Sequence, residues 1–148
     1  MISDGTRISL YDYLSSLFGG VTENLYPMTE PTETTKSDAE DGFLVTNVGN
    51  VNDESEFGGD AYGWVRCQVT AFVPKRTRGR LNKELYKTFE DAILEVIKEN
   101  TGLQNEDGYY ILEDSVLSME DNENTQQGNQ YHVFVKSFVV VIDQQRSS

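Results

Sequence analysis

The sequence predicts an α+β domain, namely a two-layer α/β sandwich in which about four mainly antiparallel strands carry two helices on one face. Three observations lead to this fold class. Apolar residues recur at helical spacing in two segments, they alternate with polar residues in one long segment, and 148 residues with 37% hydrophobic side chains suffice for one core. We expect a single domain over residues 1–148, with its core at about 9–142 and the order helix, strand, strand, helix, strand, strand.

The first helix is expected in SLYDYLSSLFGG, residues 9–20. Ser9 is a natural N-cap with Asp12 three residues later, and the glycine pair 19–20 is placed to end the helix. Apolar residues follow the cap at helical spacing: Leu10, Tyr13, Leu14, Leu17 and Phe18. Residues 22–41 then hold two of the three prolines, many Thr and Glu residues and no sustained period. We expect a long, exposed acidic loop there.

Two paired strands should follow this loop. The segment GFLVTNVGNV, residues 42–51, has the composition of a strand, and an acidic turn connects it to AYGWVRCQVTAFV, residues 61–73. Alternate residues of the second strand are apolar, which places them on one face of the sheet: Val65, Cys67, Val69, Ala71 and Val73. We expect a helix to cover that face.

The clearest helical period lies in LNKELYKTFEDAILEVIKENTG, residues 81–102. Asn82 is a suitable N-cap, Leu81 and Tyr86 are spaced as a hydrophobic staple, and Gly102 is placed to end the helix in the left-handed conformation. Two further strands are predicted at 109–120 and 131–143. They flank an acidic hairpin loop at 120–130, and residues 143–148 form a polar tail.

Positive charge is concentrated at one place in a chain whose formal net charge is -13. Half of the twelve Lys and Arg residues lie between positions 75 and 87, beginning with KRTRGR, which holds Lys75, Arg76, Arg78 and Arg80. The acidic excess lies in the loops between strands. A solvated turn with extended basic side chains is one interpretation of this cluster. A subunit with separate acidic and basic patches is also suited to head-to-tail contacts, which generate rings when the rotation closes.

No catalytic constellation is visible, so we expect no enzyme, no cofactor and no metal site. A nucleophile would need a neighbouring base, and the one histidine, His132, lies within a predicted strand. The acidic pairs Glu113–Asp114 and Glu120–Asp121 are adjacent in sequence and do not converge. The segment DNENTQQG, from residue 121, has alternating oxygen ligands but lacks the glycine at the sixth position and the glutamate at the twelfth position of a calcium loop.

The lone cysteine and the absence of a visible signal peptide favour a reducing compartment, and no stretch approaches a membrane span. The surrounding acidity disfavours a primary DNA binder. Acidity does permit a different class, a small inhibitor that mimics DNA in the basic groove of a nucleic-acid enzyme. That alternative leaves the basic cluster unexplained.

Over residues 9–142 the chain resembles the tail terminator and tail-completion (neck ring) proteins of tailed bacteriophages. The likeness rests on the opening LYDYLSSLFGG, the strand WVRCQVTAFV, the charged turn, the helix LNKELYKTFEDAILEVI and the closing strand YHVFVKSFVVVID. It implies a tail-terminator-like fold and a structural subunit of the virion, assembled in the host cytoplasm. Such a subunit forms a ring of six or twelve copies that joins the head or portal to the tail, and DNA passes through its lumen without sequence-specific binding.

Within that ring, we expect Lys75, Arg76, Arg78 and Arg80 to contact acidic residues of the adjacent subunit or of a neighbouring portal, connector or tail protein. The candidate acidic partners are Asp53, Glu54 and Glu56. The acidic loops are equally suited to face the lumen, where carboxylates would repel DNA phosphates. A monomeric inhibitor or DNA mimic stays the alternative function, and a generic binding module is the third.

Overall fold

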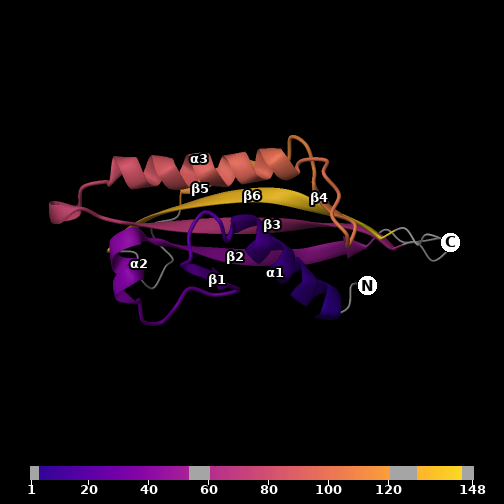
Figure 1. Ribbon diagram of the computed structural model, residues 1–148, viewed down its shortest axis with the longest axis horizontal. Helices are drawn as coiled ribbons and strands as arrows, with labels where there is room; N and C mark the ends of the chain where they lie inside the picture. Colours follow the sequence, from indigo (N-terminus) through magenta and orange to yellow (C-terminus); the bar gives the residue numbers. More distant parts are fainter. Residues whose placement is uncertain (1–3, 54–60, 121–129, 145–148) are drawn as a thin grey trace.

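The computed structural model describes residues 4–53, 61–120 and 130–144. They form an open, mixed sheet of six strands in the order β1-β2-β3-β6-β4, with β5 also pairing with β6 (Figure 1). The pairing of β1 with β2 is parallel, and the other pairings are antiparallel. The elements are α1 (Asp4–Phe18), β1 (Leu25–Pro27), α2 (Lys36–Asp41), β2 (Phe43–Asp53), β3 (Ala61–Pro74), the short 3-10 helix η1 (Thr77–Gly79), α3 (Lys83–Asn100), β4 (Tyr109–Ile111), β5 (Leu117–Glu120) and β6 (Tyr131–Gln144).

The α+β class and the mostly antiparallel sheet are confirmed. The five alternating apolar residues predicted on one face of β3 are all buried in the main core cluster. Side chains of both α1 and α3 belong to the same cluster, among them Leu14, Phe18 and Ile93. Two helices therefore cover one face of the sheet, because the period of two in β3 and the helical period in α1 and α3 present matching apolar surfaces.

The opposite face carries a smaller aromatic cluster at the end of the sheet where β3 stops. Phe43 stacks on Phe72, with ring centroids 4.4 Å apart, and Tyr131 meets both rings edge-on. Tyr26 packs against this cluster and donates its hydroxyl hydrogen bond to Asp38 Oδ2 of α2 at 2.7 Å. The short helix α2 is thereby fixed at this end of the sheet.

The predicted loop at 22–41 is wrong in part, because it contains β1 and α2. Thr35 caps α2 by accepting from the backbone N–H of Asp38, and the Asp38 carboxylate accepts from the N–H of Thr35. Strand β1 has three residues and forms by pairing with β2. A strand this short has no period in the sequence, since tertiary pairing supplies its stability.

The start of the first helix also differs from the prediction. Helix α1 begins at Asp4, so Ser9 lies inside it and is not an N-cap. The Ser9 hydroxyl instead accepts a hydrogen bond from Tyr109 at 3.0 Å. The additional turn is tied to the sheet by Arg7, which donates to the carbonyls of Val48 and Gly49. The predicted end of this helix, before the glycine pair 19–20, is confirmed.

The single strand predicted at 109–120 is two strands, and together with β1 they give the sheet six strands where about four were expected. The chain leaves the sheet after Ile111, turns at Asp114 with φ +59°, and returns as β5. The guanidinium of Arg66 donates to the carbonyl of Ser115 at 3.2 Å and holds this turn over β6. The acidic hairpin loop at 120–130 and the polar tail at 143–148 lie mostly outside the described residues.

Helix α3 matches its predicted ends. Asn82 is the N-cap and accepts from the N–H of Leu85, and Gly102 has φ +72° just after the helix. Residues Phe89, Ile93 and Ile97 are buried at the helical spacing predicted for them. With these boundaries, the basic turn at residues 75–80 joins the end of β3 to the first turn of α3.

Candidate functional site

The basic segment forms a closed turn at one end of the sheet. Lys75 extends the pairing of β3 with β6 by donating its backbone N–H to the carbonyl of Gln130 at 3.0 Å. The N–H of Arg76 donates to the carbonyl of Arg80 at 2.8 Å, and the N–H of Gly79 donates back to the carbonyl of Arg76. These two backbone bonds to Arg76 fix the turn, and Figure 1 shows it projecting past the ends of α2 and α3.

Arg78 occupies the tip of this turn in an unusual backbone conformation. Its φ is +65° and its ψ is +26°, in the left-handed region that costs a residue with a side chain about 1 kcal/mol. Gly79, with φ +71°, follows it. Glycine would satisfy the turn better at position 78. An arginine that is held at this cost is consistent with a role for its side chain outside the turn.

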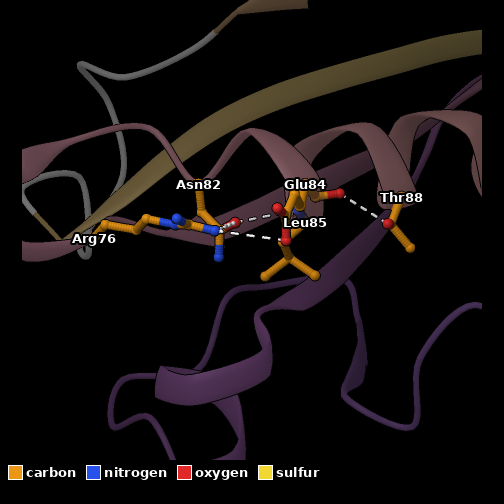
Figure 2. Close-up of polar contacts among 5 residues, drawn as sticks. All are labelled: Arg76, Asn82, Glu84, Leu85 and Thr88. Atoms are coloured by element: carbon orange, nitrogen blue, oxygen red, sulfur yellow. Dashed lines mark hydrogen bonds and ion pairs between the residues drawn. The ribbon is translucent and has the colours of Figure 1, made fainter.

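Arg76 links the turn to the start of α3. Its guanidinium donates to Asn82 Oδ1 at 3.2 Å and lies 3.7 Å from a carboxylate oxygen of Glu84 (Figure 2). Figure 2 also shows Asn82 reaching the N–H of Leu85. Both partners of the Arg76–Glu84 ion pair are exposed, so water and salt weaken it. The arrangement orients the turn with respect to the helix and uses Arg76 within its own subunit.

The other three basic side chains of the turn form no ion pair within the described residues. Arg78 and Arg80 are exposed, and Lys75 is half-buried. Lys75 lies close enough to His132 to help lower the pKa of that imidazole, although burial of His132 is the larger cause. The turn therefore presents the positive charges of Arg78 and Arg80 to whatever lies beyond this end of the molecule.

The structure separates the basic turn from the expected acidic partner Asp53. Asp53 pairs with Gly63 near the start of β3, whereas the turn follows Pro74 at the end of the same strand. At about 3.3 Å per residue, the two ends lie roughly 36 Å apart, so they cannot meet within one subunit. Glu54 and Glu56 lie outside the described residues.

Further acidic residues gather at the Asp53 end. The sheet register pairs Tyr62 with Asp143 and Gly63 with both Asp53 and Ile142, which brings these positions together. The loop after α3 adds Glu106 and Asp107, both exposed, and it is fastened by the N–H of Asp143, which donates to the carbonyl of Gly108 at 2.9 Å. Sequence reasoning missed Glu106, Asp107 and Asp143 at this end. The pairing of β6 with β3 places Asp143 there, and the backbone bond from Asp143 to Gly108 places the loop that carries Glu106 and Asp107.

The described residues offer few other groups for catalysis or metal binding. Burial raises the pKa of the Cys67 thiol to about 12, so this cysteine is a packed core residue with little thiolate. No group of acidic, histidine and cysteine side chains is arranged to hold a metal ion within the described part of the chain. None of its described helices is long and apolar enough to cross a membrane.

A pocket of about 370 Å³ lies beside the basic turn, between the start of α3 and the adjoining ends of β5 and β6. It is lined by Leu81, Tyr86, Glu120, His132 and Val133. The hydroxyl of Tyr86 donates to Glu120 at 3.4 Å. The sequence identified His132 only as a strand residue and did not indicate that tertiary structure places it next to a carboxylate and a tyrosine.

No protein-family model and no curated protein matches this sequence.

Proposed function

We propose that this protein is a structural subunit of a tailed-phage virion that assembles head-to-tail into a neck or tail-completion ring around the DNA channel. The proposal rests on one observation. The basic turn, residues 75–80, and the acidic residues Asp53, Glu106, Asp107 and Asp143 lie at opposite ends of one long sheet. Opposite charges about 36 Å apart on one subunit favour contact between the basic end of one copy and the acidic end of the next.

The geometry favours self-assembly over a role for the turn within the subunit. Arg78 and Arg80 have no ionic partner in the described residues, and two backbone hydrogen bonds hold the shape of the turn. A preorganised contact loses less conformational entropy on association. Asp53, Glu106, Asp107 and Asp143 supply acidic positions at the other end. The turn–acidic-end contact is heterologous, so it closes into a ring when the rotation between subunits permits.

Native mass spectrometry and light scattering test the proposal across protein concentration, with and without magnesium. We expect a closed oligomer of six or twelve copies, which magnesium strengthens by screening repulsion between subunits of net charge -13. A monomer under every condition contradicts self-assembly and favours the alternative function, an acidic inhibitor or DNA mimic. The next measurement would then be capture of a partner on the immobilised protein.

A matched pair of variants separates the turn from the overall charge. The double variant Arg78→Glu with Arg80→Glu should abolish the oligomer while circular dichroism shows a folded subunit. The control Lys36→Glu with Lys98→Glu changes the net charge equally, at two exposed positions outside the turn. Assembly of the control and failure of the turn variant support the contact. Equal effects of both variants would show that only the net charge matters and would refute the contact.

A further inference from the structure

The two edges of the sheet differ in how their backbone groups are satisfied. At the β2 edge, side chains of α1 form hydrogen bonds with backbone groups of β2 that do not pair with β1. Arg7 donates to the carbonyls of Gly49 at 2.9 Å and Val48 at 3.0 Å, and the N–H of Val48 donates to the Tyr11 hydroxyl. A register shift follows Val48. These are devices by which proteins prevent another strand from adding to an edge.

The β5 edge has no comparable cover within the described residues. Leu117–Glu120 pairs with β6 alone, and all four residues are exposed. In an antiparallel pair, every second residue turns its N–H and C=O away from the partner strand, so half of β5 presents free backbone groups outward. No backbone hydrogen bond from another described segment reaches them. This edge is therefore geometrically open to an added strand.

The side chains of β5 divide into an apolar row and a polar row. Leu117 and Met119 lie opposite Ser137 and Val135 of β6, and they are 54% and 48% exposed. Ser118 and Glu120 lie on the other face, where the hydroxyl of Ser118 accepts from Lys136 at 2.8 Å. An incoming strand would thus place alternate side chains beside two apolar residues, and the remaining ones on the side of Glu120.

The net charge of the chain disfavours another copy of the same strand as the occupant. Two β5 strands side by side would bring together two subunits that each carry a net charge of -13. The chain's own basic cluster is no substitute occupant, because its backbone bonds close it into a turn. Charge complementarity thus favours a basic segment from a different protein.

The pocket at the end of β5 fits the end of such a segment. It combines the carboxylate of Glu120 with the ring and hydroxyl of Tyr86 and the apolar side chain of Leu81. A lysine or arginine side chain can bury its aliphatic part against Leu81 and pair its charge with Glu120 beside the aromatic ring. Lys75, whose charge reaches the neighbouring His132, makes no ion pair with Glu120.

We propose that β5 and this pocket bind an extended segment of another protein by strand addition. The segment alternates apolar residues, which pack beside Leu117 and Met119, with basic residues, one of which enters the pocket at Glu120. This contact uses neither Arg78 and Arg80 nor the acidic residues at the opposite end of the sheet, so it stands whether or not the protein forms a ring.

Fluorescence anisotropy with the full-length protein tests this proposal. The probe is a fluorescein-labelled heptapeptide that alternates valine with lysine, and a peptide that alternates valine with glutamate is its control. We expect saturable binding of the lysine peptide and at least about tenfold weaker binding of the glutamate peptide. N-methylation of alternate residues, which removes the backbone donors on one edge, should weaken the lysine peptide by at least about tenfold.

Protein variants locate the binding edge. Glu120→Gln should weaken the lysine peptide about threefold, the size of one partly exposed ion pair. Glu23→Gln makes the same charge change beside the covered edge and should leave binding unchanged. Amide hydrogen exchange should show protection at Leu117–Glu120 when the lysine peptide saturates the protein. Equal weakening by both variants, no effect of N-methylation, or unchanged exchange in β5 would each overturn the proposal.

Discussion

Lys136 Nζ lies 2.9 Å from Glu90 Oε2 and joins the middle of β6 to α3 beneath the helix. Lys136 faces the core side of the strand, at the same parity as Phe134 and Phe138, and only 6% of its side chain is exposed. Its ammonium group also donates to Ser118 Oγ at 2.8 Å and lies 5.6 Å from the centroid of the Phe134 ring. The contact thus connects α3, β5 and β6 through one buried cation.

Removal of the anion from this contact should be more damaging than removal of the cation. Glu90→Gln leaves the buried ammonium of Lys136 without a carboxylate, and we expect a loss of about 1–3 kcal/mol in the free energy of unfolding. Lys136→Met fills the same space with an apolar side chain, and Glu90 is exposed enough to stay hydrated, so a loss of about 1 kcal/mol or less is expected. Urea denaturation measures both. A larger loss for Lys136→Met would contradict this interpretation of the pair.

Gly42 should tolerate substitution much less well than Gly79. It has φ +78° and ψ 179°, a conformation that is almost exclusive to glycine. An added Cβ would lie 2.6 Å from the carbonyl oxygen of Phe72 and 2.8 Å from the Phe89 ring. We expect Gly42→Ala to cost about 3 kcal/mol or more in the free energy of unfolding.

Gly79→Ala is the control for this substitution, because Gly79 has φ +71° and nothing within 4 Å of an added Cβ. Its expected cost is about 1 kcal/mol, from the backbone conformation alone. Thermal and urea denaturation of the two variants compare the effects. Equal costs would show that the close contact of position 42 with Phe72 and Phe89 adds nothing.

Tyr26 and Asp38 should depend on each other for their contribution to stability. Asp38 is fully buried, and its Oδ2 accepts both from the Tyr26 hydroxyl at 2.7 Å and from the N–H of Thr35. Burial, and then the bond to Asp38, raises the pKa of Tyr26 to about 12, so the phenol stays protonated and donates at neutral pH. We expect Tyr26→Phe to cost about 1–2 kcal/mol in the free energy of unfolding.

A double-mutant cycle with Asp38→Asn measures the coupling, because both variants keep the side-chain volume nearly constant. If the two losses simply add, the hydrogen bond between these residues contributes no energy of its own. Thr35→Ala provides a reference for the cap of α2 without Tyr26, with an expected loss of about 1 kcal/mol.

Long periodic segments made most of the fold predictable. Helix α3 and strand β3 repeat an apolar pattern over many residues, strands β2 and β6 are long and rich in β-branched and aromatic residues, and Asn82 and Gly102 mark the ends of α3. Strand β1 and helix α2 were missed because three and six residues carry no period, and because their partners, Leu44 and Tyr26 among them, are tertiary. The turn at Asp114 likewise depends on Arg66, which is distant in sequence.

The candidate site was predictable only at its basic end. Arg78 and Arg80 stand out by local charge density, which needs no knowledge of the fold. The acidic end is built from Asp53, Asp107 and Asp143, which come from three separate segments. The register of β2, β3 and β6 places Asp53 near Asp143, and the bond from Asp143 to the carbonyl of Gly108 places the loop of Asp107. The pocket at His132 and Glu120 depends on the pairing of β5 with β6 and on the start of α3, so no single segment of the sequence reveals it.

His132 should make the protein less stable as the pH falls below neutrality. Burial and the nearby charge of Lys75 lower the pKa of this imidazole from its usual 6.5. Between the lowered pKa and 6.5, the unfolded chain binds the proton more readily than the folded protein, so the free energy of unfolding rises with pH in that window. We expect stability to decrease from pH 7.5 to pH 5.5. His132→Gln should flatten this dependence.

The measurement is direct because His132 is the one histidine in the sequence. Its ring proton resonances report its pKa in the folded protein by nuclear magnetic resonance, and urea denaturation at each pH reports stability. Lys75→Gln should raise the pKa toward 6.5 and reduce the slope, whereas Lys36→Gln, on α2, should change neither. A folded-state pKa at or above 6.5, or a slope that survives His132→Gln, would assign the pH dependence to other groups.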